Sequence, residues 1–557
     1  MSTTLGEPTT ANLIEHTPSA YQYPLLIKHL LHTPLAHAAD QEIVYRDLQR
    51  FDYRTLFERI GRLASGLASL GVQPGNTVAM MDWDSHRYLE CFFGVPMMGA
   101  VLHTVNIRLS PEQILYTINH AQDDVILVNA EFLPVLEEIK DRIQPVKKLV
   151  LLTDEGDRIT TSLPIAAEYE DLLDSSSAEY PFGDFDENTR ATTFYTTGTT
   201  GLPKGVYFSH RQLVLHTLAT MAALGTAPEG QRLHRADVYM PITPMFHVHA
   251  WGIPYIATVL GIKQVYPGRY TPDGLLGLIQ REKVTISHCV PTLLHMLLNN
   301  PASQNIDLTG WKVMIGGSAL PKGLARTAME RGIDVFGGYG MSETCPVLSI
   351  AQLTPAMLDR DSDGQVDMRV KAGRPIPLVD LRIVDDEMRD VAHDGQTPGE
   401  VVVRAPWLTQ GYLKDQQNSE QLWRGGYLHT SDIGTIDPLG YLLITDRIKD
   451  VIKSGGEWIS SLEIEDILSQ HPGVSEAAVI GVPDERWGER PVALVVLRPS
   501  HIGVLSEDDI KAHVANYAGK GVISKWAVPS RVRFVEIIDK TSVGKLDKKL
   551  LRQKYSD

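Results

Sequence analysis

The alternation of apolar and polar positions predicts a chain of alternating helices and buried strands. Residues 53–70 place apolar side chains at helical spacing and stop at Gly71, which favours an amphipathic helix. Residues 77–81 follow as a short apolar run, as expected of a buried strand. Similar strand-like runs recur at residues 124–128, 148–152 and 311–317. This part of the chain is therefore expected to be a layered α/β structure, and the lack of a fixed repeat argues against a solenoid.

The pattern changes near residue 380. Short strands separated by glycine, proline and aspartate predict a small β-rich subdomain, with strands at residues 381–384, 399–404 and 440–444. The α/β pattern then resumes, with candidate strands at residues 475–482 and 491–497. We predict a large N-terminal domain of α/β subdomains plus the β-rich subdomain at residues 1–446, and a small α+β C-terminal domain at residues 447–557.

Length and composition are those of a large globular protein. The 557 residues allow about three to five folding units. Hydrophobic residues make up 43% and charged residues 22% of the chain, which excludes disordered, collagen-like and disulfide-scaffold proteins. The formal net charge of −16 disfavours non-specific binding to nucleic acids or anionic membranes, since both are polyanions. We therefore expect no nucleic-acid partner.

The cysteines and the first residues indicate a reducing compartment. Cys91, Cys289 and Cys345 are far apart and form no C-x-x-C spacing, so neither a disulfide framework nor a structural zinc site is indicated. The chain start lacks a basic segment followed by an apolar run, and no stretch of about 18 apolar residues occurs. We expect a cytoplasmic protein without an integral membrane segment.

The strongest local signal is a loop rich in glycine and threonine at residues 195–206. It places three glycines, four threonines and Lys204 within the run YTTGTTGLPKGV. This composition suits a polyphosphate, because glycines let backbone N–H groups approach the oxygens, hydroxyls donate hydrogen bonds and the lysine supplies a cation. A flexible surface turn is the alternative. Pro203 before the lysine and Gly205 after it exclude a Walker loop, so kinase or P-loop ATPase chemistry is not expected.

Seven motifs in the same order resemble those of the adenylate-forming enzymes, the family of acyl-CoA synthetases, adenylation domains and beetle luciferases. The glycine-threonine loop resembles the family signature, with Thr197 where many members have serine. The others are the aromatic and histidine segment at 244–252, the adenine and magnesium segments at 316–318 and 339–344, the ribose segment at 430–434, the hinge and its following loop at 446–459, and the tail motif at 540–546.

The resemblance implies an enzyme that activates a carboxylic acid with ATP and Mg²⁺ as an acyl-AMP, releases pyrophosphate, and transfers the acyl group to coenzyme A. A free carboxylate is a poor acyl donor, and cations preorganised around the α-phosphate can each contribute about 10²–10³ in rate. The implied catalytic residues are Lys545, Thr199, Glu343 and His247. Lys545 would bridge the attacking carboxylate and the α-phosphate. Lys520 is the weaker competitor, because it lacks the tail motif.

The implied nucleotide contacts divide by role. Glu343 is the candidate metal ligand, because Mg²⁺ takes one or two carboxylates beside phosphate oxygens and waters. Tyr339 can stack on adenine, and Asp432 with Arg447 can hold the ribose hydroxyls; core packing and a turn aspartate are the ordinary alternatives. The other nucleotide-binding candidates are Thr196, Thr197, Gly198, Thr200, Gly201, Lys204, Gly316, Gly317, Ser318, Gly338, Gly340, Met341 and Ser342.

The resemblance also places an acyl pocket and a moving segment. The residues similar to those that line or close the acyl pocket are His247, Trp251, Gly317 and Gly340. His247 and His249 have no third ligand at a recognisable spacing, so we predict no zinc site. A mobile C-terminal domain would rotate about the hinge residue Lys449 between two half-reactions, and a plain linker is the alternative. The segment brought to the pantetheine arm would be Ser454, Gly455, Gly456, Glu457 and Trp458.

Residues 103–110 and 456–461 are most similar to bacterial medium- and long-chain fatty acyl-CoA ligases and to relatives that act on short alkyl or thioalkyl acids. Leu462 precedes Glu463 where many members have Asn-x-x-Pro-x-Glu, so the coenzyme A contacts do not transfer in detail. Activation of an aryl acid, loading of a carrier protein and a catalytically silent nucleotide sensor stay open. The sensor is expected to lack the catalytic lysine or the metal-ligand glutamate, and both are present. The resemblance allows a homodimer.

Overall fold

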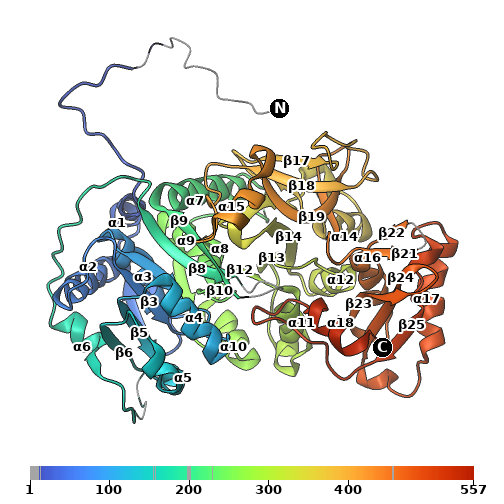
Figure 1. The fold of residues 1–557 in the computed structure, drawn as a ribbon, viewed down its shortest axis with the longest axis horizontal. Coiled ribbons are helices and arrows are strands. Elements are labelled where there is room, and N and C mark those ends of the chain that lie inside the picture. Colours follow the sequence, from blue (N-terminus) through green and yellow to red (C-terminus); the bar gives the residue numbers. More distant parts are fainter. Residues whose placement is uncertain are drawn as a thin grey trace.

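The computed structural model describes residues 12, 14–154, 156, 159–196, 202–228, 230–454 and 457–556, with the backbone alone at Trp458. Figure 1 shows layers of helices and sheets from the blue to the green part of the chain, a yellow-orange β-rich layer beside them, and a red C-terminal unit at one end. The expected mixed α/β fold is confirmed.

The first sheet is parallel except at one edge, where β8 and β9 run antiparallel. In spatial order its strands are β7 (Ile165–Glu168), β6 (Lys148–Leu152), β5 (Val125–Asn129), β3 (Thr77–Met81), β4 (Val101–Thr104), β8 (Arg190–Thr196) and β9 (Lys204–Ser209). The central strands β3 and β5 are buried at every position, as expected where helices cover both faces. The strands predicted at 77–81, 124–128 and 148–152 are confirmed as β3, β5 and β6.

The second sheet joins the start of the chain to its middle. In spatial order its strands are β16 (Arg374–Pro375), β15 (Val347–Ile350), β14 (Asp334–Gly340), β13 (Lys312–Ile315), β12 (Ile286–Cys289), β10 (Val238–Ile242), β11 (Lys263–Tyr266), β1 (Glu42–Tyr45) and β2 (Gln49–Asp52). The strand predicted at 311–317 is β13. Strand β1 pairs in parallel with β11, so the N-terminal segment completes a sheet whose centre comes from residues far along the chain.

Helices cover these two sheets. They are α1 (His32–His37), α2 (Tyr53–Ser69), α3 (His86–Met97), α4 (Pro111–Ala121), α5 (Leu133–Ile139), α6 (Tyr169–Asp174), α7 (His210–Gly225), α8 (Val248–Trp251), α9 (Ile253–Leu260), α10 (Pro272–Glu282), α11 (Pro291–Asn299), α12 (Lys322–Glu330), α13 (Pro355–Leu358) and α14 (Ser362–Arg369). The predicted helix at 53–70 is α2, whose N-cap Asp52 accepts a hydrogen bond from the Thr55 N–H at 2.8 Å. Gly71, with φ +94°, follows its C-cap.

The β-rich subdomain expected from residue 380 is an antiparallel sheet. Its strands are β17 (Asp380–Val384), β18 (Gly399–Arg404), β19 (Leu428–Ile436) and β20 (Leu442–Arg447), with α15 (Gln416–Leu422) between β18 and β19. Each strand pairs with the next along the chain, and a short turn at residues 437–441 joins β19 to β20.

The C-terminal unit has its own sheet and core. Its elements are β21 (Ile452–Ser454), β22 (Glu457–Ile459), α16 (Ser461–Ser469), β23 (Val474–Asp484), β24 (Gly488–Leu497), α17 (Glu507–Gly519), β25 (Arg531–Phe534) and α18 (Lys548–Tyr555). The predicted strands at 475–482 and 491–497 are β23 and β24. One cluster around Ile464 and Val495 and another around Ile480 and Leu551 are built from residues of this unit. The domain boundary near residue 447 stays a prediction.

Hydrogen bonds and apolar contacts join the units to one another. The Thr104 hydroxyl at the end of β4 donates to the Phe246 carbonyl at 2.9 Å and so joins the first two sheets. Val543, from the C-terminal tail, is buried in the core cluster formed mainly by residues before 447. Within the described residues, no helix combines the length and the apolar character that crossing a bilayer requires.

Candidate active site

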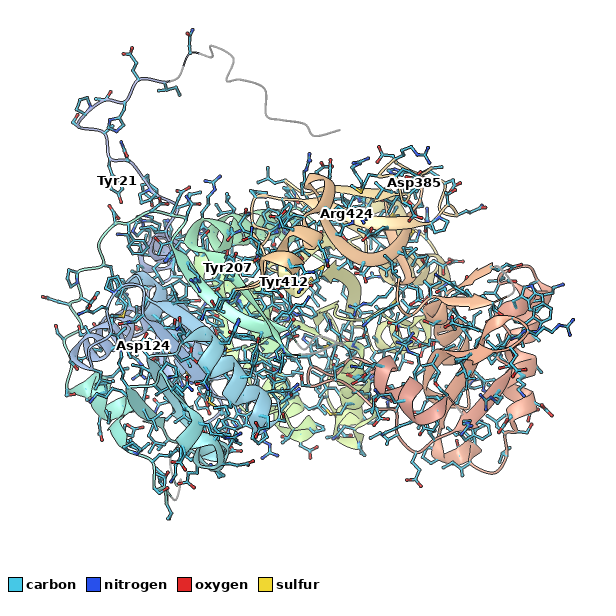
Figure 2. All side chains as sticks on the ribbon, viewed as in Figure 1. Tyr21, Asp124, Tyr207, Asp385, Tyr412 and Arg424 are labelled. Atoms are coloured by element: carbon cyan, nitrogen blue, oxygen red, sulfur yellow. The ribbon has the colours of Figure 1, made fainter. Side chains whose placement is uncertain are left out.

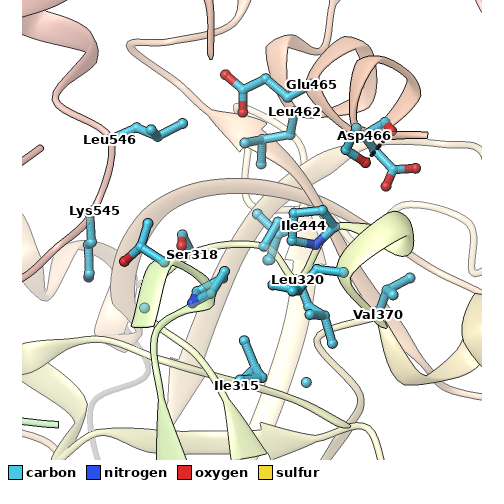
Figure 3. A pocket seen from close by; sticks show the side chains of 18 of the residues that line it. Ile315, Ser318, Leu320, Val370, Ile444, Leu462, Glu465, Asp466, Lys545 and Leu546 are labelled. Atoms are coloured by element: carbon cyan, nitrogen blue, oxygen red, sulfur yellow. Dashed lines mark hydrogen bonds between the residues drawn. The ribbon is translucent and has the colours of Figure 1, made fainter. Parts of the chain in front are cut away.

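A cavity of about 1140 Å³ lies where these units meet. Its walls include Thr196 at the end of β8, Ile315 at the end of β13 and Gly340 at the end of β14. The carboxyl ends of strands are the usual ligand-binding edge of open α/β sheets. Figure 3 shows Lys545, from the tail segment, on one side of this pocket, and Asp466, from α16, on another.

Most of the residues selected from the sequence line this cavity. They are Thr196, His247, Gly317, Ser318, Gly338, Tyr339, Gly340, Met341, Ser342, Glu343, Asp432, Arg447, Lys449 and Lys545. Gly316 and Trp251 line a smaller space of about 30 Å³, which shares His247, Gly317, Gly340 and Lys545 with the large one. Thr197, Gly198, Thr199, Thr200, Gly201, Gly455 and Gly456, and the side chain of Trp458, lie outside the described part of the chain.

Lys545 reaches the cavity from a tight hairpin. The Thr541 N–H donates to the Lys545 carbonyl at 2.7 Å, and the Lys545 N–H donates to the Thr541 hydroxyl at 3.2 Å. Gly544 makes the turn with φ +84°, a conformation that favours glycine. A Cβ on Gly317 would stand 3.2 Å from Lys545 Cε, so the glycine backbone leaves room for the lysine to pass.

The charges around Lys545 set its protonation. Desolvation and the nearby Arg447 cation lower the pKa of Lys545 to about 8. The carboxylates of Asp432 and Glu343 act in the opposite direction. A desolvated ammonium facing carboxylates and a second cation is an arrangement that a polyanionic ligand would stabilise, because it would supply the missing negative charge.

Asp432, Arg447 and Tyr339 form one hydrogen-bonded group. The antiparallel register of β19 and β20 places Asp432 opposite Arg447, whose Nε donates to Asp432 Oδ1 at 3.2 Å. The Tyr339 hydroxyl donates to Asp432 Oδ2 at 2.8 Å. Desolvation raises the pKa of Tyr339 well above its ordinary value, so the hydroxyl keeps its proton. The Asp432 carboxylate is thereby oriented at the cavity wall, and the Tyr339 ring lies beside it.

Glu343 is held by a tyrosine that the motifs did not indicate. The Tyr412 hydroxyl donates to Glu343 Oε1 at 2.8 Å, and desolvation raises the pKa of this buried carboxyl. The Lys204 ammonium lies 4.5 Å from the centre of the Tyr412 ring, a cation–π contact. Lys204 does not line the cavity. Figure 2 shows Tyr207 and Tyr412 close together, where the Val206–Tyr412 bridge and the Thr409 hydrogen bond to the Tyr207 carbonyl join β9 to residues 409–412.

The histidine segment makes an unusual turn beside the smaller space. Residues 248–251 all have positive φ, between 47° and 59°, so α8 is a left-handed turn rather than an ordinary helix. Desolvation, with a smaller effect from Lys545, lowers the pKa of His247 to about 3, so its imidazole is neutral at pH 7. Trp251 packs on His288, with 4.9 Å between the centres of the two rings. A Cβ on Gly316 would stand 3.0 Å from the Trp251 ring, so Gly316 accommodates the indole.

The segment after β20 divides between the cavity and its surroundings. Lys449 lines the cavity, and desolvation lowers its pKa. Ser454 and Glu457 do not line it. The Ser454 hydroxyl is buried without a hydrogen-bond partner among the described residues, and Glu457 accepts a hydrogen bond from the Ser524 hydroxyl.

Two family models match most of the chain. A model described as "AMP-binding enzyme" matches residues 32–413, and one described as "AMP-binding enzyme C-terminal domain" matches residues 463–545. The predicted boundary at residue 447 lies between the two matches, in residues 414–462, which neither model covers.

Similar curated proteins are acid–coenzyme A ligases. A long-chain-fatty-acid–CoA ligase of Thermus thermophilus is 39% identical over 93% of this chain and 93% of its own length. A 3-methylmercaptopropionyl-CoA ligase of Ruegeria lacuscaerulensis is 38% identical, with 96% and 98% of the two chains covered. A medium-chain-fatty-acid–CoA ligase of Ectopseudomonas oleovorans is 37% identical, covering 90% and 89%.

Solved structures share the fold at lower identity. The anthranilate CoA ligase AuaEII in complex with anthranoyl-AMP superposes with a TM-score of 0.83 at 23% identity, covering 96% of this chain and 98% of that chain. ATP-bound MatB from Rhodopseudomonas palustris gives a TM-score of 0.80 at 24% identity, covering 96% and 99%.

Proposed function

Because this chain belongs to the AMP-binding enzyme family, in its acyl-CoA synthetase branch, we propose that it joins a medium- or long-chain fatty acid to coenzyme A through an acyl-AMP. It is an AMP-forming acid–thiol ligase that uses ATP and coenzyme A. The observation that carries the assignment of the site is the position of Lys545, which shares one cavity with Glu343, Asp432 and Arg447.

In the first half-reaction, an oxygen of the acid attacks the α-phosphate and the bond to pyrophosphate breaks. Negative charge then accumulates on the transferred phosphoryl group, and the Lys545 ammonium is placed to neutralise it. Asp432 accepts the ribose hydroxyls and Arg447 holds that carboxylate in place. His247 borders the acyl side of the cavity. Its imidazole is neutral at pH 7, so it adds no positive charge that would hold back the departing pyrophosphate.

Glu343 fits the role of a Mg²⁺ ligand. Its carboxylate faces the cavity, and the Tyr412 hydroxyl at Oε1 fixes its orientation, as hydrogen bonds to metal-bound carboxylates commonly do. One carboxylate would be enough, because ATP oxygens and waters would supply the other ligands. Mg²⁺ bound there would neutralise charge on the ATP phosphates.

In the second half-reaction, the thiol of coenzyme A attacks the acyl carbonyl and AMP leaves. We propose that the C-terminal unit, with its boundary near residue 447, then rotates about Lys449. The rotation would withdraw Lys545 and bring the segment from Ser454 to Trp458 to the pantetheine arm. Its support is that Ser454 and Glu457 stand away from the cavity while Lys545 lies in it, so the two sets of groups do not act together.

One observation favours a shorter acid as the second candidate. The space beside Trp251 and His247 is about 30 Å³, which is about the volume of one water molecule. A short alkyl or thioalkyl acid fits there with less rearrangement than a long chain, which needs the indole to move. The 3-methylmercaptopropionyl-CoA ligase from Ruegeria lacuscaerulensis is also nearly as similar as the long-chain enzyme.

A panel of acids separates the two candidates. AMP release is measured with 3-methylthiopropionate, benzoate and straight-chain acids from propionate to palmitate, each with and without coenzyme A. The proposal expects coenzyme A-dependent release that is fastest with acids of about eight or more carbons, since each added methylene contributes about 1–3 kcal/mol of binding. A maximum at three or four carbons supports the second candidate. Turnover with none of the acids would contradict both.

A further inference from the structure

The hairpin that carries Lys545, residues 541–545, contacts two polar side chains from the N-terminal part of the chain, Asn106 and Arg108, which we call the dock. The Asn106 amide donates to the Ser542 hydroxyl at 3.1 Å, across 436 residues of sequence. The Arg108 guanidinium donates to the Ser542 carbonyl at 3.1 Å. A third hydrogen bond comes from the start of α11, where the Thr292 hydroxyl donates to the Gly544 carbonyl at 3.2 Å. The hairpin is thus held between the first and second sheets.

The loop that carries Asn106 and Arg108 is itself fixed. The Arg108 N–H donates to the Asn106 side-chain oxygen at 3.0 Å, which turns the amide nitrogen toward Ser542. With the hairpin in place Asn106 is buried, and the hydrogen bond within the loop orients its donor without any contribution from the hairpin. Preorganised donors of this kind hold a partner at little entropic cost.

The same loop borders the acyl segment. Just before it, the Thr104 hydroxyl holds the Phe246 carbonyl, and the Arg108 guanidinium lies 6.0 Å from the centre of the Phe246 ring. The dock therefore lies between the segment expected to bind the acid and the hairpin that carries the lysine. Residues at this place can position Lys545 while the acid is bound.

We propose that Asn106 and Arg108 are positioning residues that dock the Lys545 hairpin for the first half-reaction and release it for the second. This inference rests on the proposed role of Lys545. The polar part of the contact suits a reversible dock, because it consists of a few hydrogen bonds and one of its donors, Arg108, is exposed; Val543 of the same hairpin adds a buried apolar contact. Each hydrogen bond therefore contributes modestly, and solvent can replace it when the hairpin leaves.

Separate assays of the two half-reactions in the full-length protein test this dock. Formation of acyl-AMP from ATP and the preferred acid is followed by rapid quench without coenzyme A. Reaction of synthetic acyl-AMP with coenzyme A is followed without ATP. Asn106→Ala and Arg108→Ala should each slow the first reaction by about threefold to tenfold and leave the second unchanged or faster. Arg108→Lys should recover much of the loss, because it keeps a cationic donor.

Ser542→Ala provides the decisive comparison. It removes the hydroxyl that Asn106 uses and keeps the carbonyl that Arg108 uses. The double variant with Asn106→Ala should then be no slower than either single variant, whereas the double variant with Arg108→Ala should show the product of the two effects. Arg142→Ala is the matched control, since that arginine pairs with Glu112 on the exposed surface and should leave both reactions unchanged.

Equal slowing of both half-reactions by the Asn106 and Arg108 variants, or no slowing of the first, would overturn the dock. Hydrogen exchange of the peptide covering residues 540–546 gives a reading that does not depend on catalysis, and it should be faster in both variants than in the unaltered protein. Unchanged exchange also overturns it. If the unaltered protein forms no acyl-AMP with any acid, the proposed function fails, while the exchange result still decides whether the hairpin docks through these residues.

Discussion

Lys545 is cationic only below its lowered pKa of about 8, which makes its charge sensitive to moderately alkaline pH. The protonated form is the one that can neutralise the phosphoryl group, so activity that depends on it is present below about pH 8 and lost above. Because bound ATP would raise this pKa by its negative charge, kcat/KM for ATP, which reports the free enzyme, is the parameter to follow.

We predict that kcat/KM for ATP in acyl-AMP formation falls tenfold per pH unit above about pH 8. Lys545→Arg is the matched control, because a guanidinium with a pKa above about 12 stays charged. That variant should be slower at neutral pH and lack the alkaline limb. The same limb in both proteins would assign it to another group.

Tyr412 orients Glu343 through a single hydroxyl, and Tyr412→Phe removes that hydroxyl while keeping the ring under Lys204. We predict that the Mg²⁺ concentration needed for half-maximal activity rises about tenfold or more, as is typical when a group that orients a metal ligand is lost. Excess Mg²⁺ should restore much of the rate. Titration of activity with Mg²⁺ at fixed ATP measures both effects, and an unchanged midpoint would show that Glu343 needs no such support.

Among the structural elements, the hairpin of β14 and β15 contributes part of the cavity wall, and glycines allow its strands to come close together. A Cβ on Gly340 would stand 1.8 Å from the Pro346 carbonyl oxygen, so the two strands approach more closely than any side chain allows. Gly316 does the same for Trp251 at the end of β13. Gly340 sets the distance between its two strands and Gly316 leaves room for the Trp251 indole, so both glycines shape the wall.

We predict that Gly340→Ala destabilises the protein by about 1–3 kcal/mol, because one strand must move away from the other. Gly277→Ala is the control: it lies in α10 with no atom within 4 Å of its Cβ position, and alanine there should stabilise by about 0.5–1 kcal/mol. Urea unfolding followed by circular dichroism measures both. Equal midpoints for the two variants would contradict the close approach.

For the protein as a whole, sequence reasoning identified contiguous features better than contacts between distant segments. The strands β3, β5 and β6 were predictable because parallel strands are continuous apolar runs. Residues around Glu343 and Asp432 were predictable because each lies in a short motif that is contiguous in sequence. The pairing of β1 with β11 was not, since periodicity says nothing about which strands meet.

The site residues missed by the motifs share this cause. Tyr412 acts on Glu343 across 69 residues, and Asn106 and Arg108 act on Ser542 across more than 400. No local pattern encodes such contacts, although residues 103–110 resemble those of a subgroup of acyl-CoA ligases. The glycine-threonine loop was the strongest sequence signal, and its central residues, 197–201, lie outside the described part of the chain.

The division of labour between the two units predicts different losses in the two half-reactions. Lys545→Ala should reduce acyl-AMP formation by about 10²–10³ or more, since it removes a preorganised cation. It should leave the reaction of synthetic acyl-AMP with coenzyme A intact, because the lysine is expected to be withdrawn in that step. Single-turnover assays of each step decide this, and equal losses in both would contradict the proposed alternation.

The most direct measurement of the central claim is isotope transfer from the acid to AMP. The preferred acid, labelled with ¹⁸O in both carboxylate positions, is converted with ATP and coenzyme A, and the AMP is examined by mass spectrometry. If the carboxylate attacks the α-phosphate, each AMP carries one ¹⁸O atom. AMP without the label, or formation of ADP, would show that no acyl-AMP is made.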